Sequence, residues 1–365
     1  MFHEAELREL VEFDGQESPV VSLYLHVDPR FRTADEYKLI LRGLLDGAVG
    51  VEQADRERIE RFFDLEYDRK ARGVVCFSCQ KQGFWRSYAF ETPVDDAIMV
   101  DRRPLVRRLV EMIDTYGHLG VVAVDKHGAR FFSFHLGELE EARGMVGEEV
   151  RRHKQGGWAA QRYQRHEDEA ALANLREAAE QTDELRRQNH WQRLVLAGTE
   201  ANVARFRDLL PSHLQQLVVG AMPLELDANI NTVRERAEAV AMQARAGYIA
   251  QLADDLLVVA GKENGAVVGL KPTLDAVQSG RIYQLLFTEN YEVGVDAVRR
   301  CERCGYLSSD GNGACPVCGG ARQPLADAIN TLARRSIAQG ANVIVLPPGS
   351  SLATEGHHIG AFLRF

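Results

Sequence analysis

The chain is organised around residues 151–165, which read Arg151-Arg152-His153-Lys154-Gln155-Gly156-Gly157-Trp158-Ala159-Ala160-Gln161-Arg162-Tyr163-Gln164-Arg165. This stretch contains five Arg or Lys residues and no Asp or Glu, although the net charge of the whole chain is −9. Its two adjacent glycines permit backbone conformations that other residues avoid. Because each Lys or Arg contact with a phosphate releases a counterion, this basic loop predicts a phosphate-rich partner such as RNA.

The alternative interpretation is a surface loop whose charges are only solvated. Trp158 argues against it, because an exposed indole on a loop is costly and its ring suits stacking on a base. The absence of acidic side chains from this part of an acidic chain also favours a binding role. An alanine-rich helix is expected to begin at Glu167, directly after the loop.

Length and composition bound the class of protein. With 365 residues, 45% hydrophobic and 27% charged, the chain is typical of a globular protein of two or three domains. It has no apolar run that could cross a membrane and no signal-peptide pattern, so we expect a cytoplasmic protein. The acidic balance argues against general DNA coating but permits local RNA contacts.

The hydrophobic pattern predicts alternating strands and helices. Strands are expected at residues 20–27, 73–79, 84–90, 120–125, 129–134, 193–198, 217–220, 282–287, 341–346 and 359–365. Helices are expected at residues 33–67, 104–116, 167–188, 199–210, 231–253, 267–280 and 324–338. This alternation predicts a multidomain α/β fold with helices packed on mostly parallel or mixed sheets. We expect three α/β units, at residues 1–115, 116–254 and 255–365.

The six cysteines form three C-x-x-C pairs. Cys76 and Cys79 lie within a strand pattern, whereas a redox pair should open a helix, so we interpret them as buried strand cysteines. The other two pairs have the spacing of a zinc ribbon at residues 301–318, with the ligands Cys301, Cys304, Cys315 and Cys318. Four thiolates would leave no open coordination position, which predicts a structural Zn²⁺. The alternative is a knuckle that has lost its metal or is redox-active.

No local motif indicates an enzyme. The chain has no G-x-S-x-G elbow or Walker loop, and we interpret residues 261–265 as a turn. Asp125 and Asp227 lie near strand ends, where catalytic carboxylates occur, but neither has an evident partner. His357 and His358 precede the last strand and are interpreted as lone surface histidines.

Three separate stretches resemble one protein family. Gly156-Gly157-Trp158-Ala159-Ala160-Gln161-Arg162-Tyr163 resembles the G-G-Q-S-x-x-R-F segment of archaeal and eukaryotic class-1 release factors. Residues 265–286, with the four-cysteine module after them, resemble the third domain of those factors. The ending, residues 359–365, is similar to their G-G-I-x-A-x-L-R-Y closure. Order and spacing agree over roughly residues 118–365, so the chain resembles a bacterial member of the release-factor/Pelota superfamily.

The sequence departs from the family pattern at two functional positions. The catalytic glutamine, which helps to place water at the peptidyl-tRNA ester, would fall at Trp158. An indole has only a donor and cannot position water as an amide does, while Gln155 and Gln161 do not occupy the matching position. The N-I-K-S stop-codon motif is absent from residues 1–112. With these departures the chain resembles Pelota-type rescue factors and Balon-like hibernation factors.

The resemblance implies a non-catalytic factor that occupies the ribosomal A site in hibernation or rescue. The middle unit would reach the peptidyl-transferase centre, and the N-terminal unit the decoding centre. The last unit would be an L7Ae-like domain with the zinc ribbon inserted in it, and would contact a translational GTPase such as elongation factor Tu. The residues implied in rRNA binding are Arg151, Arg152, Lys154, Gly156, Gly157, Trp158, Arg162 and Arg165.

Two other hypotheses remain open. A peptidyl-tRNA hydrolase or peptide-chain release factor would use Gln155 or Gln161 in a non-standard glycine loop. A zinc-ribbon adaptor unrelated to ribosomes would not need Arg151 and Arg152 for RNA binding. None of the three hypotheses requires DNA or a membrane as a partner.

Overall fold

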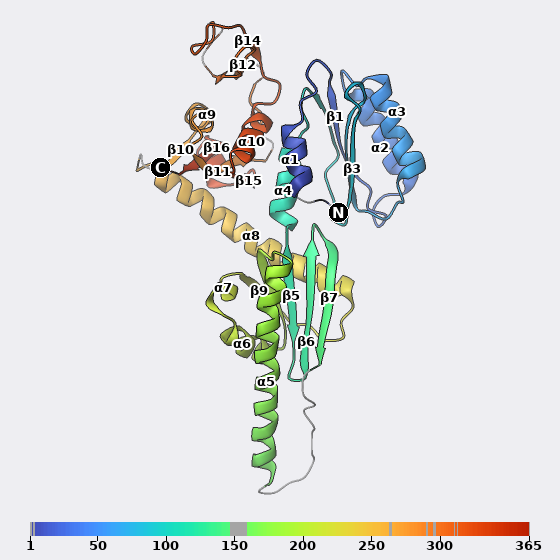
Figure 1. The fold of residues 1–365 in the computed structure, drawn as a ribbon, viewed down its shortest axis with the longest axis vertical. Helices are drawn as coiled ribbons and strands as arrows, with labels where there is room; N and C mark the ends of the chain where they lie inside the picture. The colour runs from blue at the N-terminus through green and yellow to red at the C-terminus, as the bar shows by residue number, and fades with distance from the viewer. Residues whose placement is uncertain are drawn as a thin grey trace. The chain divides into compact units, whose positions relative to one another are not determined.

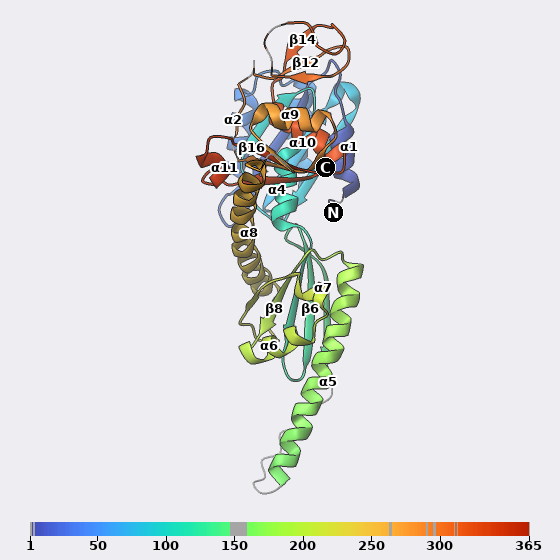
Figure 2. The same cartoon turned by 90° about the vertical axis from the view of Figure 1, so that its left-hand side faces the viewer.

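The computed structural model describes residues 2, 4–146, 159–262, 265–289, 291–294, 297–309, 311 and 313–364. The chain divides into two compact units (Figures 1 and 2). Unit 1 comprises residues 1–114 and 248–365, and unit 2, residues 115–247, is inserted between these two parts. The expected division into three domains stays a prediction, although each part of unit 1 has its own sheet. Among the described helices, none is long and apolar enough to cross a membrane.

The first part of unit 1 contains a four-stranded antiparallel sheet of order β3-β2-β1-β4. Its strands are β1 (Val20–His26), β2 (Gly73–Cys79), β3 (Phe84–Phe90) and β4 (Ala97–Asp101). The helices of this part are α1 (Glu4–Glu12), α2 (Ala34–Gly47), α3 (Gln53–Arg61), the π-helix η1 (Phe62–Glu66), the 3₁₀ turn η2 (Gln80–Gln82) and α4 (Arg107–Tyr116). The helices α2 and α3 share a core with one face of β1, because Val21, Leu23 and Leu25 alternate toward it.

The prediction of a single continuous helix over residues 33–67 is wrong, because the structure has separate helices there. Thr33 does cap its start, where its side chain and that of Glu36 form a reciprocal capping box. The helix α2 then ends at Gly47, and α3 begins only at Gln53. Gly50 lies between them with φ of 89°, a left-handed conformation that a helix cannot include.

The second part of unit 1 contains a four-stranded sheet of order β10-β16-β11-β15, in which only β11 and β15 pair in parallel. Its elements are β10 (Ala266–Val268), α9 (Leu270–Gln278), β11 (Ile282–Thr288), α10 (Ala328–Ala338), β15 (Asn342–Leu346), α11 (Ser351–Thr354) and β16 (Ile359–Leu363). One sheet face packs on α9 and α10, and the other on the end of α8 (Ile230–Ala260). This part is therefore a three-layer α/β/α arrangement.

A separate three-stranded sheet is inserted between β11 and α10 (Figure 1). It consists of β12 (Arg299–Cys301), β13 (Leu307–Ser308) and β14 (Arg322–Pro324), in the order β13-β12-β14. Two expected helices are therefore too long. The helix expected from residue 324 begins at Ala328, because Pro324 still belongs to β14, and the helix expected from residue 267 begins only after β10.

Arg334 joins the two parts of unit 1. Its side chain is 2% exposed and donates hydrogen bonds to backbone carbonyl oxygens of the first part, those of Leu10, Val11, Phe13 and Pro104. One turn earlier on α10, Asn330 donates to the oxygen of Pro104 at 3.0 Å and accepts from the N–H of Val106 at 3.0 Å. Burial lowers the pKa of Arg334 to about 10, so the guanidinium is still charged at neutral pH.

Unit 2 is a mixed five-stranded sheet of order β7-β6-β5-β8-β9 with helices on both faces. Its elements are β5 (Leu119–Val124), β6 (Gly128–His135), β7 (Glu138–Val146), α5 (Ala159–Gln188), β8 (Arg193–Gly198), α6 (Glu200–Leu209), α7 (Ser212–Gln215) and β9 (Val218–Met222). Val122 and Val124 face α5 and α6, whereas Val121 and Ala123 face the first turns of α8. Of the two expected sheet types, mostly parallel or mixed, the structure has the mixed one, and the predicted hairpin across residues 126–128 is confirmed.

Trp191 fixes the join between α5 and β8. The indole is 2% exposed, and its Nε1–H donates to Ser133 Oγ at 2.9 Å. Its ring lies against Gly120 of β5, where an added Cβ would be 2.3 Å from Trp191 Cδ2. The glycine at position 120 is therefore required by the volume of the indole.

Gly120→Ala is expected to lower the free energy of unfolding by about 1–3 kcal/mol, because a methyl group would overpack this site. Gly144→Ala is the matched control, since a Cβ at Gly144 of β7 would meet no atom within 4 Å. Denaturant unfolding monitored by circular dichroism measures both. Equal midpoints for the two variants would contradict this account of the site.

Candidate metal centre and RNA-binding segment

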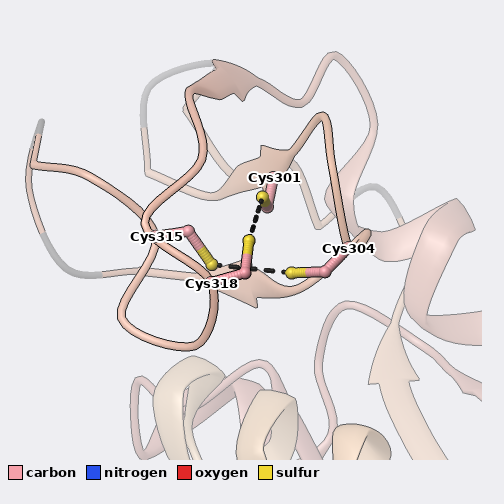
Figure 3. Close-up of side chains that lie close together, drawn as sticks. All are labelled: Cys301, Cys304, Cys315 and Cys318. Carbon is pink, nitrogen blue, oxygen red and sulfur yellow. Dashed lines mark hydrogen bonds between the residues drawn. The ribbon is translucent and has the colours of Figure 1, made fainter.

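The structure brings together the four cysteines of residues 301–318 (Figure 3). Cys301 ends β12, Cys304 follows in the next turn, and Cys315 and Cys318 lie in a second turn before β14. All four sulfur atoms lie within 4.8 Å of one another. The Sγ atoms of Cys301 and Cys318 are 3.4 Å apart, and those of Cys304 and Cys315 are 3.6 Å apart.

The two C-x-x-C turns have nearly the same backbone. The glycine after each pair is left-handed, with φ of 71° at Gly305 and 69° at Gly319. Each glycine N–H donates at 2.9 Å to the carbonyl oxygen of the first cysteine of its pair, Cys301 or Cys315. A side chain would strain this conformation, so the residue after each pair must be glycine for the turn to close.

Backbone groups favour the thiolate form of the first cysteine in each turn. The N–H of Cys304 donates to the Cys301 sulfur and lowers the pKa of that thiol to about 6. At Cys315 burial opposes ionisation, but the N–H groups of Cys318 and Val317 lower the pKa of the thiol. Because the thiolate is the form that binds metals, these hydrogen bonds prepare the turns for a metal ion.

The arrangement fits a tetrahedral Zn²⁺ site. Zn–S bonds of about 2.3 Å place neighbouring sulfurs about 3.8 Å apart, close to the shortest separations found here. Among the described residues, no other group of three or more His, Cys, Asp or Glu side chains has this geometry. Gly320 also matters, since a Cβ there would lie 3.2 Å from Cys301 Sγ and 3.4 Å from Cys318 Sγ. The cluster is therefore compatible with zinc.

The third pair, Cys76 and Cys79, is not a reactive site. Both side chains are fully buried in β2, and burial raises the pKa of each thiol. Residues three positions apart on a strand face opposite sides of the sheet, so the two thiols cannot meet. The prediction of buried strand cysteines is confirmed.

The basic segment differs from the expectation in where the helix begins. The helix α5 begins at Ala159 rather than at Glu167, because the residues after Trp158 are strong helix formers. Gln161, Arg162 and Arg165 therefore lie in the first turns of a helix and not in a loop. The remaining predicted RNA-binding or alternative catalytic residues lie outside the described part of the chain: Arg151, Arg152, Lys154, Gln155, Gly156, Gly157 and Trp158.

The helix α5 carries the end of this segment beyond the sheet. Figures 1 and 2 both show its N-terminal turns extending past the strands of unit 2. From Ala171 to Leu185 the helix has a buried stripe at helical spacing, formed by Ala171, Asn174, Leu175, Ala178, Ala179, Thr182 and Leu185. Packing in unit 2 thus anchors the second half of the helix, while its first turns are directed away from the sheet.

The other polar candidates are structural. Asp125 Oδ1 accepts the N–H groups of His127 at 2.7 Å and Gly128 at 2.9 Å, so it shapes the hairpin turn. Asp227 is also in a turn. The interpretation of His358 as a lone surface histidine is wrong, because its ring stacks on Tyr291 with centroids 5.1 Å apart and its Nδ1 lies 3.3 Å from Thr288 Oγ1.

Comparison with known families identifies the central part of the chain. Residues 104–242 match the model of bacterial archaeo-eukaryotic release factor family 10. Over this segment, which is less than half of the chain, the protein is similar to the bacterial release factors of archaeo-eukaryotic type. The match includes the basic segment and most of unit 2. The resemblance based on three short motifs is therefore confirmed at the level of the superfamily.

Solved structures of release factors and Pelota proteins are only distantly similar. An archaeal translation termination factor, aRF1, is 16% identical, with 100% of this chain and 99% of that chain covered and a TM-score of 0.29. Dom34 of S. cerevisiae is 12% identical, with 82% of this chain and 81% of that chain covered and a TM-score of 0.41. A chain of ribosome-bound archaeal Pelota with ABCE1 is 13% identical, with 99% of this chain and 94% of that chain covered and a TM-score of 0.43. No curated protein matches the chain. The assignment accordingly rests on the family match.

Proposed function

We propose that this protein is a cytoplasmic ribosome-binding translation factor that occupies the A site in hibernation or rescue without hydrolysing peptidyl-tRNA. One observation carries the proposal: the segment that matches a bacterial release-factor family has Gly156-Gly157-Trp158 where the archaeal and eukaryotic class-1 release factors that it resembles have Gly-Gly-Gln. The release-factor scaffold is thus combined with a residue that cannot position water. The protein would therefore still bind the ribosome, but it would lack the glutamine that places water for hydrolysis.

The proposed contacts with rRNA are electrostatic and stacking contacts. Arg151, Arg152 and Lys154 would neutralise backbone phosphates, while the indole of Trp158 stacks on a base. Arg162 and Arg165 would add phosphate contacts from α5, which carries its first turns beyond the sheet. The segment would reach the peptidyl-transferase centre, as the resemblance implies.

Arg151→Glu with Arg152→Glu is expected to weaken ribosome binding at least tenfold at moderate salt, because each replaces an attraction to phosphate by a repulsion. Filter binding to 70S ribosomes over a salt series measures the affinity. Arg205→Glu with Arg207→Glu, on the exposed side of α6, is the control with the same change in net charge. Equal losses for both pairs would show that only net charge matters. An Arg151→Glu with Arg152→Glu variant that binds as well as wild type would favour an adaptor unrelated to ribosomes.

The alternative hydrolase is tested separately by peptide release from ribosome-bound peptidyl-tRNA. Wild type is expected to release no more peptide than a reaction without the protein. Gln161 lies in the first turn of α5 rather than at a loop tip, and Gln155 precedes both glycines, so neither matches the family position. Release by wild type that disappears in Gln155→Ala with Gln161→Ala, with ribosome binding intact, would establish the enzyme.

The last part of the chain would be the partner-binding domain. We infer that residues 255–365 form an L7Ae-like domain carrying a structural zinc ribbon at 301–318, and that this domain contacts a translational GTPase such as elongation factor Tu. The three-layer arrangement around β11 and the clustered cysteines are compatible with this assignment. Four sulfur ligands would saturate Zn²⁺, so its role would be to hold the ribbon together.

A further inference from the structure

Arginine side chains converge beside the first cysteine turn. Arg335 of α10 donates from Nη2 to the carbonyl oxygen of Gly305 at 2.5 Å. A Cβ built on Gly305 would lie 3.8 Å from Arg335 Nη2 and 3.9 Å from Arg300 Nε. These two nitrogen atoms are therefore less than 8 Å apart. Burial lowers the pKa of Arg335, and the positive charges of Arg300 and Arg103 lower it further.

One of the carboxylates near Arg300, that of Asp14, is already shared by two other arginines. Asp14 accepts from Arg102 at 2.5 Å through one oxygen and from Arg103 at 2.7 Å through the other. Although partial burial opposes it, these hydrogen bonds lower the pKa of Asp14 to about 2, so its carboxylate is fully engaged. Asp101 is the second acid, and burial raises its pKa. Asp14 and Asp101 both act on the charge of Arg300, whereas the charged groups that act on Arg335 are arginines.

Arg300 has no hydrogen bond or ion pair through its side chain with any part of the chain that the structure describes. Arg300 and Arg335 are both partly buried, and the only side-chain hydrogen bond of Arg335 there is to a neutral carbonyl oxygen. Partly burying a cation without a counter-charge costs free energy, and like charges in proximity add repulsion. An anion bound between the two guanidinium groups would offset both effects.

We propose that Arg300 and Arg335 bind a backbone phosphate of RNA. A guanidinium fork matches the geometry of phosphate oxygens, which accept charge-assisted hydrogen bonds of about 2.8 Å. Two nitrogens less than 8 Å apart can donate to different oxygens of one phosphate group. The choice of RNA as the source of the phosphate rests on the proposed ribosome-binding function. This site would add an RNA contact in unit 1, apart from the basic segment of unit 2.

The test is the affinity of the full-length protein for a short double-stranded RNA, measured by fluorescence anisotropy over a salt series. Arg300→Gln is expected to weaken binding several-fold. It should also reduce the magnitude of the slope of log affinity against log salt by about 1, because one phosphate contact is lost. Arg205→Gln, an exposed residue of α6, removes the same charge and should leave the slope unchanged. Arg300→Lys keeps the charge and should preserve most of the slope.

Zinc content and the unfolding midpoint of each variant show whether the neighbouring cysteine turn is intact. Inorganic phosphate should raise the unfolding temperature of wild type more than that of Arg300→Gln. If phosphate stabilises wild type more than Arg300→Gln but the two proteins bind RNA equally well, RNA is not the ligand. If the two proteins differ neither in their stabilisation by phosphate nor in their RNA affinity, the proposed site does not exist. Since the probe is isolated RNA, these failures are distinct from a failure of wild type to bind 70S ribosomes, which would refute the proposed function itself.

Discussion

Arg334→Met is expected to lower the free energy of unfolding by about 2–5 kcal/mol. Methionine can fill much of the volume, but it cannot donate to the carbonyl oxygens of Leu10, Val11, Phe13 and Pro104. Each buried carbonyl left without its donor costs about 1–3 kcal/mol, less where a second donor or water reaches it. Urea unfolding followed by circular dichroism measures the loss.

Arg61→Met is the control for this prediction, because Arg61 is 70% exposed and its contact with Glu66 is a long surface ion pair of 3.6 Å. Removing such a pair changes stability by about 0.5 kcal/mol or less. We also expect Arg334→Met to expose residues 1–114 to limited proteolysis, since the lost hydrogen bonds join α10 to that part of unit 1. A midpoint equal to that of Arg61→Met would show that the buried guanidinium does not stabilise the fold.

Cys301→Ser is expected to abolish stoichiometric zinc binding and to disorder the small sheet of β12, β13 and β14. Only four sulfur ligands are brought together, and a neutral serine hydroxyl is a far poorer ligand than a thiolate. Structural zinc sites contribute folding free energy directly, so the ribbon should lose its structure with the metal. The zinc content of the purified protein, measured by atomic emission, checks the first effect.

Cys79→Ala is the matched control for zinc content, since it removes a buried cysteine of β2 and should leave one zinc per chain. A zinc chelator added to wild type should release the metal and reproduce the Cys301→Ser spectrum. Wild type without zinc after growth in zinc-supplemented medium would contradict the assignment, as would a Cys301→Ser variant that retains one equivalent.

Much of the fold could be predicted because its signals are local. The bounds of β2, β3 and β8 agree with the predicted strands, since each is a run of mainly apolar residues bounded by turn residues. A helix is expected at residues 199–210, and Thr199 caps α6 at its start, where its Oγ1 accepts the N–H of Asn202 at 3.4 Å. The errors lie where local signals compete or are short. The run of basic residues predicts a loop that continues to Arg165, whereas helix propensity makes α5 begin at Ala159. The strand β10 is only three residues long, too short for its pattern to be separated from the helix that follows it.

The candidate metal centre could be predicted, and the arginine contacts could not. Cysteine ligands come in two closely spaced pairs, so their grouping is encoded within eighteen residues of sequence. Arg334 bonds to Leu10 across 324 positions, and nothing in its own helix distinguishes it from a solvated arginine. The same holds for Arg335, whose contact with the carbonyl oxygen of Gly305 joins α10 to the first cysteine turn across 30 positions.

The most direct test of the central claim is co-sedimentation with 70S ribosomes, comparing wild type with Trp158→Ala. We predict that wild type sediments with ribosomes without cleaving peptidyl-tRNA, and that Trp158→Ala sediments markedly less because the indole no longer stacks on a base. Trp85→Ala serves as a control for general loss of a tryptophan, since Trp85 packs within the core around α3. Wild type that does not sediment with ribosomes at any salt concentration would contradict the account.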